Sequence, residues 1–203
     1  MGILDGVRVI AIVRYRRAGD LERVVDVVSA NGILAEITLD TPGAIDAIAA
    51  ATGRGATVGA GTVIDAEGVR ASAAAGARFV VSPGLVDDVV GTALSFGLEP
   101  IPGIATATEL LHARALGARV VKVFPAATLG GPAFIRALRS PFPDGDLVAV
   151  GGVEIGDIGE YLDAGATAVG LGRGLVGAEP PADDAAFTAL AERAAAAAAA
   201  GRR

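Results

Sequence analysis

The chain has 203 residues, of which 52% are hydrophobic and 20% are charged. This length and composition predict a single globular domain over residues 1–203 with a full apolar core. The net charge of -6 disfavours nucleic acid as a partner. The sequence has no cysteine and one histidine, which excludes disulfides, thiolate catalysis and zinc sites made of cysteines or of three histidines. A hard cation on carboxylates, such as magnesium, stays compatible with the composition.

The distribution of apolar residues along the chain predicts a protein that is not inserted in a membrane. A membrane helix needs about 20 consecutive apolar residues, and no such run occurs outside the alanine-rich C-terminal region. The run Ala194–Ala200 is short, and we expect it to form the last turns of a helix that frays after about residue 194. The N-terminus lacks the basic and apolar segments of a secretory signal, so the cytoplasm is the expected compartment.

Short runs rich in β-branched residues recur along the chain and predict strands. They are nearly continuous in apolar residues, which is typical of strands that are buried on both faces. The runs are Arg8–Val13, Ile33–Leu39, Thr57–Thr62, Arg78–Ser82, Leu98–Pro102, Val120–Phe124, Leu147–Val150 and Ala168–Leu171.

Helical segments follow these strands after a few turn residues, as over 21–29 and 109–116. Thr41 before Pro42 predicts a helix start, and Thr106 with Glu109 fits a capping box. About eight strand–helix units without linkers predict a parallel sheet closed into a (β/α)8 TIM barrel. An open doubly wound sheet is the alternative. It normally has a glycine-rich fingerprint after the first strand, where this chain has Arg14–Arg17.

Lys122 is the single lysine among 17 basic residues and lies within an expected strand. Side chains alternate across a strand, so Lys122 shares a face with Val120, while Val121 and Val123 face the helices. We therefore expect Lys122 to point into the barrel near the end where barrel enzymes keep their catalytic groups. Burial lowers the pKa of an amine, and a neutral amine is a nucleophile for carbonyls. A structural lysine in a buried ion pair is the alternative.

Glu36 is the only charged residue in the expected strand 33–39. It shares a face with Leu34 and Thr38, whereas Ala35 and Ile37 lie on the other face, which suits packing against helices. Glu36 is therefore predicted to point inward and to perform acid–base chemistry on a lysine adduct. An ion pair with Lys122 that has no chemistry has the same geometry, and these residues alone leave both interpretations open.

These residues and their surroundings resemble the 2-keto-3-deoxy-6-phosphogluconate aldolase family, including its 6-phosphogalactonate and 4-hydroxy-2-oxoglutarate members. The resemblance runs from about Arg8 to Gly177 and depends on the order and spacing of several short motifs. These are Glu36-Ile37-Thr38-Leu39, Gly59-Ala60-Gly61-Thr62-Val63, Ser82-Pro83-Gly84, Pro102-Gly103-Ile104 with Ala105 to Glu109, Lys122-Val123-Phe124-Pro125-Ala126 and Gly151-Gly152-Val153.

The resemblance implies a class I aldolase that needs no metal or cofactor, with Lys122 as the Schiff-base lysine and Glu36 as the general acid/base. Its substrate would be a phosphorylated 2-keto sugar acid that is cleaved reversibly to pyruvate and D-glyceraldehyde 3-phosphate, with 4-hydroxy-2-oxoglutarate as a side substrate. The pyruvyl portion would contact Arg14, Thr62, Pro83 and Phe124, and the phosphate would bind at Gly151, Gly152, Gly172 and Arg173. Glycine turns and helix starts suit phosphate, although they also occur as ordinary barrel turns.

Two positions depart from the family pattern. Asp40 stands where many phosphogluconate-cleaving members have an arginine that helps to bind substrate, and galactonate-cleaving members often have asparagine there. Asp40 could instead cap the next helix. Arg173 stands where serine is common, and we hypothesise that it supplies the phosphate-binding cation lost at position 40.

Other functions on the same fold are a phosphate-binding epimerase or synthase, or a non-catalytic assembly scaffold. The scaffold could lose Lys122 or Glu36, and this chain keeps both. The family is usually homotrimeric, and the apolar composition is compatible with buried oligomer surface.

Overall fold

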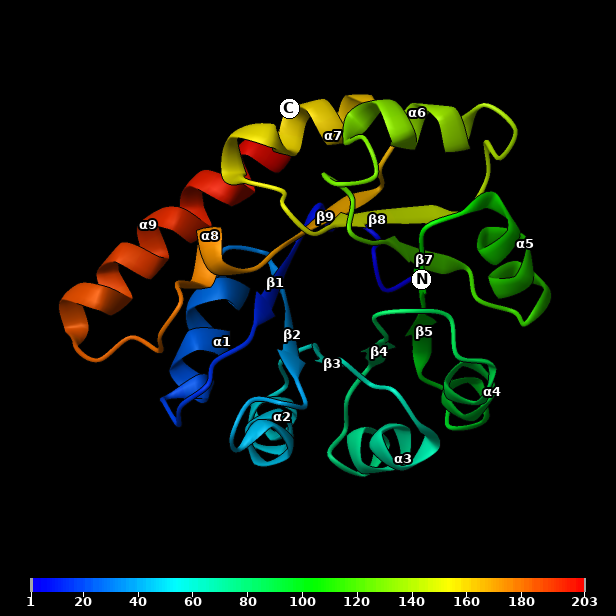
Figure 1. Cartoon of the computed structure of the whole chain (residues 1–203). Helices are drawn as coiled ribbons and strands as arrows, with labels where there is room; N and C mark the ends of the chain where they lie inside the picture. The colour runs from blue at the N-terminus through cyan, green and yellow to red at the C-terminus, as the bar shows by residue number, and fades with distance from the viewer. Residues whose placement is uncertain (1, 203) are drawn as a thin grey trace.

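The computed structural model describes residues 2–202. Within this range helices surround a ring of parallel strands (Figure 1). The strands are β1 (Val9–Val13), β2 (Leu34–Thr38), β3 (Val58–Gly61), β4 (Phe79–Val81), β5 (Glu99–Ile101), β6 (Gly103–Ile104), β7 (Val120–Val123), β8 (Asp146–Val150) and β9 (Ala168–Leu171). The helices are α1 (Leu21–Ser29), α2 (Ala44–Gly53), α3 (Ala66–Ala74), α4 (Asp87–Ser95), α5 (Ala107–Ala115), α6 (Pro132–Arg139), the 3-10 helix η1 (Ile155–Asp157), α7 (Ile158–Asp163), α8 (Arg173–Val176) and α9 (Asp184–Gly201).

The sheet closes on itself, which confirms the predicted barrel and excludes the open doubly wound alternative. The strand order is β5-β4-β3-β2-β1-β9-β8-β7-β6, and the two end strands are separated in the chain only by Pro102. The expected fifth strand is therefore two segments, because proline has no N–H to donate to the ladder. The carbonyl of Pro102 still accepts a 2.8 Å hydrogen bond from the Lys122 amide, which links this junction to β7.

The apolar residues of the strands separate into two clusters, one inside the barrel and one between the barrel and the helices. The outer cluster contains Val121 and Val123 of β7, and Ala35 and Ile37 of β2. The inner cluster contains Leu4, Ile10, Leu34, Phe79, Val81, Ile101, Val120, Val148, Val150 and Ala168. Since Leu4 precedes β1, the segment ahead of the barrel contributes to the inner core, and its dark-blue ribbon lies among the strands in Figure 1.

Helix α9 continues to Gly201, so the expectation of fraying after about residue 194 is wrong. Ala194 and Ala197 are fully buried, and α9 packs against α1 and α7. At Gly201 an added Cβ would lie 2.9 Å from the Cβ of Arg8, so a glycine lets the helix approach the start of β1. Small side chains therefore attach this helix to the barrel instead of leaving it to fray. No helix within residues 2–202 has the length and apolarity needed to cross a membrane.

The capping prediction at Thr106 is confirmed. The Thr106 hydroxyl accepts a hydrogen bond from the Glu109 amide at 3.2 Å, and the Glu109 carboxylate accepts one from the Ala105 amide at 2.8 Å. These contacts satisfy amides at the start of α5, which have no partner within the helix.

The predicted helix start at Thr41 and Pro42 is wrong. Helix α2 begins at Ala44, after Gly43 in a left-handed conformation with φ of 78°. Thr41 is instead buried, and its hydroxyl lies 3.0 Å from the Thr38 hydroxyl at the end of β2. The Thr41 side chain therefore joins the loops at the mouth of the barrel.

We predict that Leu190→Ala, in the middle of α9, lowers the free energy of unfolding by about 2–5 kcal/mol, because it leaves a cavity at a fully buried site. Urea unfolding measures the loss. Glu192→Ala on the exposed side of the same helix is the matched control and should stay within about 0.5 kcal/mol of wild type. Equal effects of the two variants would contradict the packing of α9 described above.

Candidate active site

Lys122 lies on the inner face of β7, as its alternation with Val121 and Val123 predicts. Its neighbours in the sheet are Gly103 and Val148, and its side chain is only 7% exposed. Burial lowers the pKa of the Lys122 amine, against the opposing charge of Glu36, and the nearby Arg14 charge lowers it further. The protein environment therefore favours the neutral, nucleophilic form of this amine.

Glu36 points inward from β2 and is 2% exposed. Its Oε1 atom has no hydrogen-bond partner within the described residues. Burial raises the pKa of the Glu36 carboxyl, while the charges of Lys122 and Arg14 oppose that rise. The next strand makes room for the carboxyl group, since a Cβ added at Gly61 would lie 2.1 Å from Oε1. Glu36 is thus a buried carboxyl group with one oxygen free to accept or donate a proton.

Lys122 and Glu36 are close enough to influence each other's pKa but do not form a direct ion pair. No salt bridge of 4.0 Å or less joins the two residues, both of which lie in the part of the chain that the structure describes. A structural ion pair would hold both groups in their charged forms, whereas burial here favours the neutral amine and the neutral acid. The arrangement leaves both groups available for chemistry.

Arg14 follows β1 directly and places an exposed cation at the mouth of the barrel. Its Nε lies 3.5 Å from the Thr38 hydroxyl and 3.5 Å from the Asp40 carboxylate, and its Nη2 donates to the Thr62 hydroxyl. Thr62 has φ of 56°, which is rare for a β-branched residue and costs about 1–3 kcal/mol. Arg14 is therefore bonded to a residue whose backbone is strained.

Two apolar side chains predicted for the substrate site are exposed near the buried lysine. The ring of Phe124 is 37% exposed, and the Lys122 Nζ lies 5.0 Å from its centroid. Pro83 is exposed after β4, and its carbonyl oxygen would lie 2.3 Å from a Cβ added at Gly103. Glycine at 103 therefore permits the Pro83 turn to approach the junction between β5 and β6.

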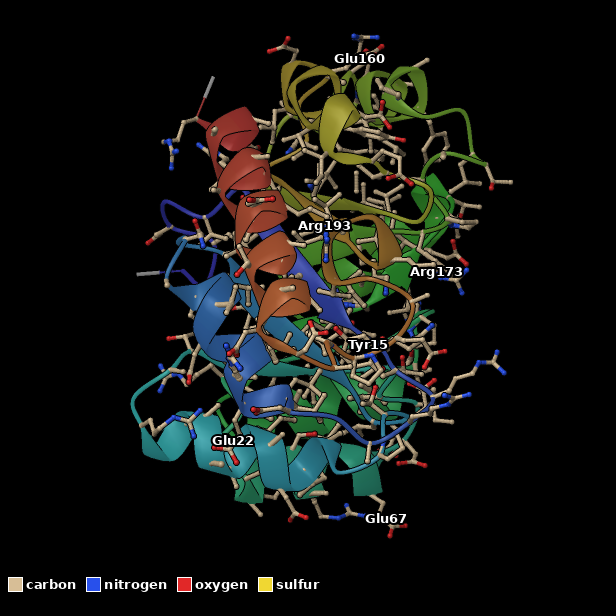
Figure 2. All side chains as sticks on the ribbon, turned by 90° about the vertical axis from the view of Figure 1, so that its left-hand side faces the viewer. Tyr15, Glu22, Glu67, Glu160, Arg173 and Arg193 are labelled. Atoms are coloured by element: carbon tan, nitrogen blue, oxygen red, sulfur yellow. The ribbon has the colours of Figure 1, made fainter. Side chains whose placement is uncertain are left out.

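The four residues predicted to bind phosphate follow β8 and β9. Gly151 and Gly152 have φ of 97° and 76°, which L-residues with side chains rarely adopt. A Cβ at Gly152 would also lie 2.7 Å from the Cβ of Ala127. Gly172 precedes α8, and Arg173 is the exposed first residue of that helix (Figure 2). Since β9 lies between β8 and β1, this group is on the same rim as Arg14.

The sequence did not predict the contacts that three residues make at the rim. The sequence predicts that Asp40 either caps α2 or stands in place of a substrate-binding cation. Its carboxylate instead lies 3.5 Å from the Arg14 Nε. Thr38 was placed on the inner face with Glu36, and that pattern was the available signal for its contact with Arg14. Tyr15 had no signal beyond its position after Arg14, and its buried hydroxyl contacts α8.

Comparison with known proteins agrees with this geometry. The family model described as "Aldolase: KDPG and KHG aldolase" matches residues 2–188. The chain belongs to this aldolase family. It is 42% identical over 162 residues to 2-dehydro-3-deoxy-phosphogluconate aldolase of Treponema pallidum, covering 78% of this chain and 77% of that protein. It is 38% identical over 159 residues to 2-dehydro-3-deoxy-6-phosphogalactonate aldolase of Escherichia coli, covering 76% of this chain and 77% of that one.

Solved structures agree with the family assignment. A structure described as "Native KDPGal structure" superposes with a TM-score of 0.85 at 34% identity, over 96% of this chain and 94% of that chain. The barrel of this KDPG/KHG aldolase family member therefore has a known counterpart over nearly its full length.

We predict that Glu36→Gln makes this aldolase more stable than wild type above pH 4.5, with a gain that grows as the pH rises. The folded state raises the pKa of Glu36 above its ordinary value of 4.5, so folding holds a proton that the unfolded chain releases. Wild type therefore loses stability as pH rises through this window, up to the folded pKa, whereas the glutamine variant does not. Urea unfolding at several pH values measures the difference. A gain that is independent of pH would contradict a buried, raised-pKa carboxyl group at position 36.

Proposed function

We propose that this chain is a class I aldolase that cleaves 2-keto-3-deoxy-6-phosphogluconate, or its galactonate epimer, to pyruvate and D-glyceraldehyde 3-phosphate. The observation that carries the proposal is the pair of inward-facing groups, Lys122 and Glu36, which burial biases toward a neutral amine and a raised-pKa carboxyl. The family of the chain and both of its named relatives, one gluconate and one galactonate aldolase, support the same reaction.

The reaction begins with attack of the neutral Lys122 amine on the C2 ketone of the substrate. The protonated Glu36 carboxyl, directly or through a water molecule, gives a proton to the C2 hydroxyl of the resulting carbinolamine, so that water leaves, an iminium ion forms and Glu36 becomes a carboxylate. The Glu36 carboxylate, directly or through a water molecule, removes the proton of the C4 hydroxyl, and the C3–C4 bond breaks. Its electron pair enters the iminium and forms an enamine, while C4 becomes the aldehyde carbon of glyceraldehyde 3-phosphate.

The second half of the reaction returns the enzyme to its starting state. Glu36, now protonated, gives its proton to C3 of the enamine, which regenerates an iminium. Water then adds to C2, pyruvate and the neutral Lys122 amine are released, and the proton freed by this hydrolysis returns to the Glu36 carboxylate. Glu36 thus needs a pKa close enough to neutral to accept a proton and give it back, and burial raises its pKa in that direction. In this scheme the two side chains supply the chemistry without a metal or cofactor.

The rim residues would hold the two charged ends of the substrate. Arg14 would contact the carboxylate of the pyruvyl portion, with Thr62, Pro83 and Phe124 as the surrounding walls. Arg14 is already oriented by hydroxyl groups and by Asp40, which limits the rotamer entropy that binding would cost. Turns at Gly151, Gly152 and Gly172 would present backbone N–H groups to the phosphate, with Arg173 beside them.

The proposal also covers the physiological substrate, the cellular compartment and the oligomeric state. Asp40 and the 38% identity to a galactonate-cleaving enzyme make the galactonate epimer a candidate beside the gluconate epimer, and 4-hydroxy-2-oxoglutarate is a candidate side substrate. Highly charged phosphorylated metabolites stay within cells, so we propose a cytoplasmic enzyme. A homotrimer, the usual state in the family that the sequence resembles, is part of the proposal, and the exposed side chains of Phe96 and Leu111 are compatible with a subunit interface.

We predict that incubation with pyruvate and borohydride attaches a reduced pyruvyl group to Lys122, which peptide mass spectrometry locates. Lys122→Met should show no adduct. Glu36→Gln should still be labelled by pyruvate but should lower kcat for cleavage by about 10²–10⁴-fold, because it removes the acid/base group. A wild-type enzyme without an adduct would contradict the proposal and favour a scaffold or another phosphate-binding barrel.

We predict that Arg173→Ser raises KM for the phosphorylated substrate far more than for 4-hydroxy-2-oxoglutarate. Loss of one charge-assisted contact to phosphate should raise the first KM by about 10-fold or more. Steady-state kinetics with the two substrates measure the split, and Arg54→Lys, at a surface ion pair of α1 with the loop after α2, is the control. Equal effects on both substrates would contradict a phosphate role for Arg173.

A further inference from the structure

Two side chains from distant parts of the chain hold the C-terminal end of α8. The Tyr15 hydroxyl, in the loop after β1, donates a 2.9 Å hydrogen bond to the Val176 carbonyl. The Arg193 Nε, on α9, donates a 2.6 Å hydrogen bond to the Leu175 carbonyl. Figure 2 shows Tyr15, Arg173 and Arg193 around this short helix. The last carbonyls of a helix have no partner within the helix, so these two donors fix its end.

Tyr15 is also attached to the loop after β2, which lies on the other side of β1 from α8. Its amide donates a 3.2 Å hydrogen bond to the Thr41 hydroxyl, which in turn lies 3.0 Å from the Thr38 hydroxyl. Thr38 contacts the guanidinium of Arg14, the residue directly before Tyr15. A single residue therefore connects the loop that carries Arg14 with the helix that carries Arg173.

The Tyr15 hydroxyl is suited to remain a donor. The side chain is 1% exposed, and burial raises its pKa to about 12, against the opposing charge of Arg193. The hydroxyl group therefore keeps its proton across the physiological pH range, and its hydrogen bond to α8 persists. This contact has no role in the bond-breaking steps described above.

From these contacts we infer that Tyr15 and Arg193 are positioning residues that set the separation between the two anion-binding ends of the substrate site. Tyr15 couples the Arg14 end to the α8 end, and Arg193 holds α8 from its outer side. The enzyme thereby prefers substrates whose carboxylate and phosphate are separated by one fixed distance. This inference rests on the proposed aldolase function.

The test uses the condensation direction with pyruvate and two aldehydes, D-glyceraldehyde 3-phosphate and D-glyceraldehyde. Tyr15→Phe keeps the buried ring and the amide contact to Thr41 but removes the donor to Val176. We expect KM for the phosphorylated aldehyde to rise by about tenfold, the effect of one lost hydrogen bond to a positioned helix. KM for D-glyceraldehyde and the rate of pyruvate trapping on Lys122 should stay within about twofold of wild type, because the Arg14 side is unchanged.

Arg193→Lys keeps the charge but loses the planar guanidinium that donates to Leu175. It should shift the aldehyde preference in the same direction as Tyr15→Phe, and Arg54→Lys should leave it unchanged. Equal rises in KM for both aldehydes, or no rise, in a folded Tyr15→Phe enzyme that still traps pyruvate would overturn the positioning role alone. A wild-type enzyme that fails to trap pyruvate would overturn the aldolase proposal and this inference together.

Discussion

The structure depends on keeping an amine and a carboxyl group inside an otherwise apolar barrel. Water cannot solvate Lys122 or Glu36 well there, and the two groups lack the direct contact that would compensate their charges. Burial therefore shifts the pKa of each group toward its neutral form. Burial of these two polar groups costs free energy. The hydrogen-bonded barrel and the packed layer of helices around it hold both side chains in place despite that cost.

The rim of the barrel carries the residues that are proposed to recognise the substrate. Arg14 lies in the loop after β1 and Arg173 begins α8 after β9, and hydrogen bonds to side-chain hydroxyls and helix carbonyls link these two segments. Orientation of this kind lowers the entropy lost on binding and matters most for a substrate with charges at both ends. The strained conformation of Thr62 belongs to the same rim.

Much of the fold could be predicted from sequence because strands and helices have different periodicities. The inward orientation of Lys122 and Glu36 followed from simple alternation, and α1 has the predicted bounds. The errors came from tertiary contacts that override local signals. Thr41 resembles a helix cap but bonds to the neighbouring loop after β1, and the alanines after 194 resemble a frayed end but fill the space beside the barrel.

The site was predictable only where chemistry demands a particular residue type. Lys122 is the single lysine, and Glu36 is the single charge of its strand, so the sequence alone identifies both as candidate catalytic residues. Asp40 and Tyr15 act through partners that lie far from them in the chain, including Val176, and no local pattern reports such contacts. The proposal that the glycines bind phosphate depends on family resemblance, because glycine turns are common in every barrel.

Gly61 has a consequence for how this enzyme can diverge. Its missing side chain is the space that the Glu36 carboxyl group occupies, so any larger residue at 61 collides with that group. A larger residue at position 61 therefore requires that the side chain at position 36, on the adjacent strand, move or become shorter. A duplicated copy that no longer needs the Glu36 carboxyl group can have a shorter residue at 36 and a larger one at 61. Such a paired replacement would identify relatives of this chain that have lost catalysis.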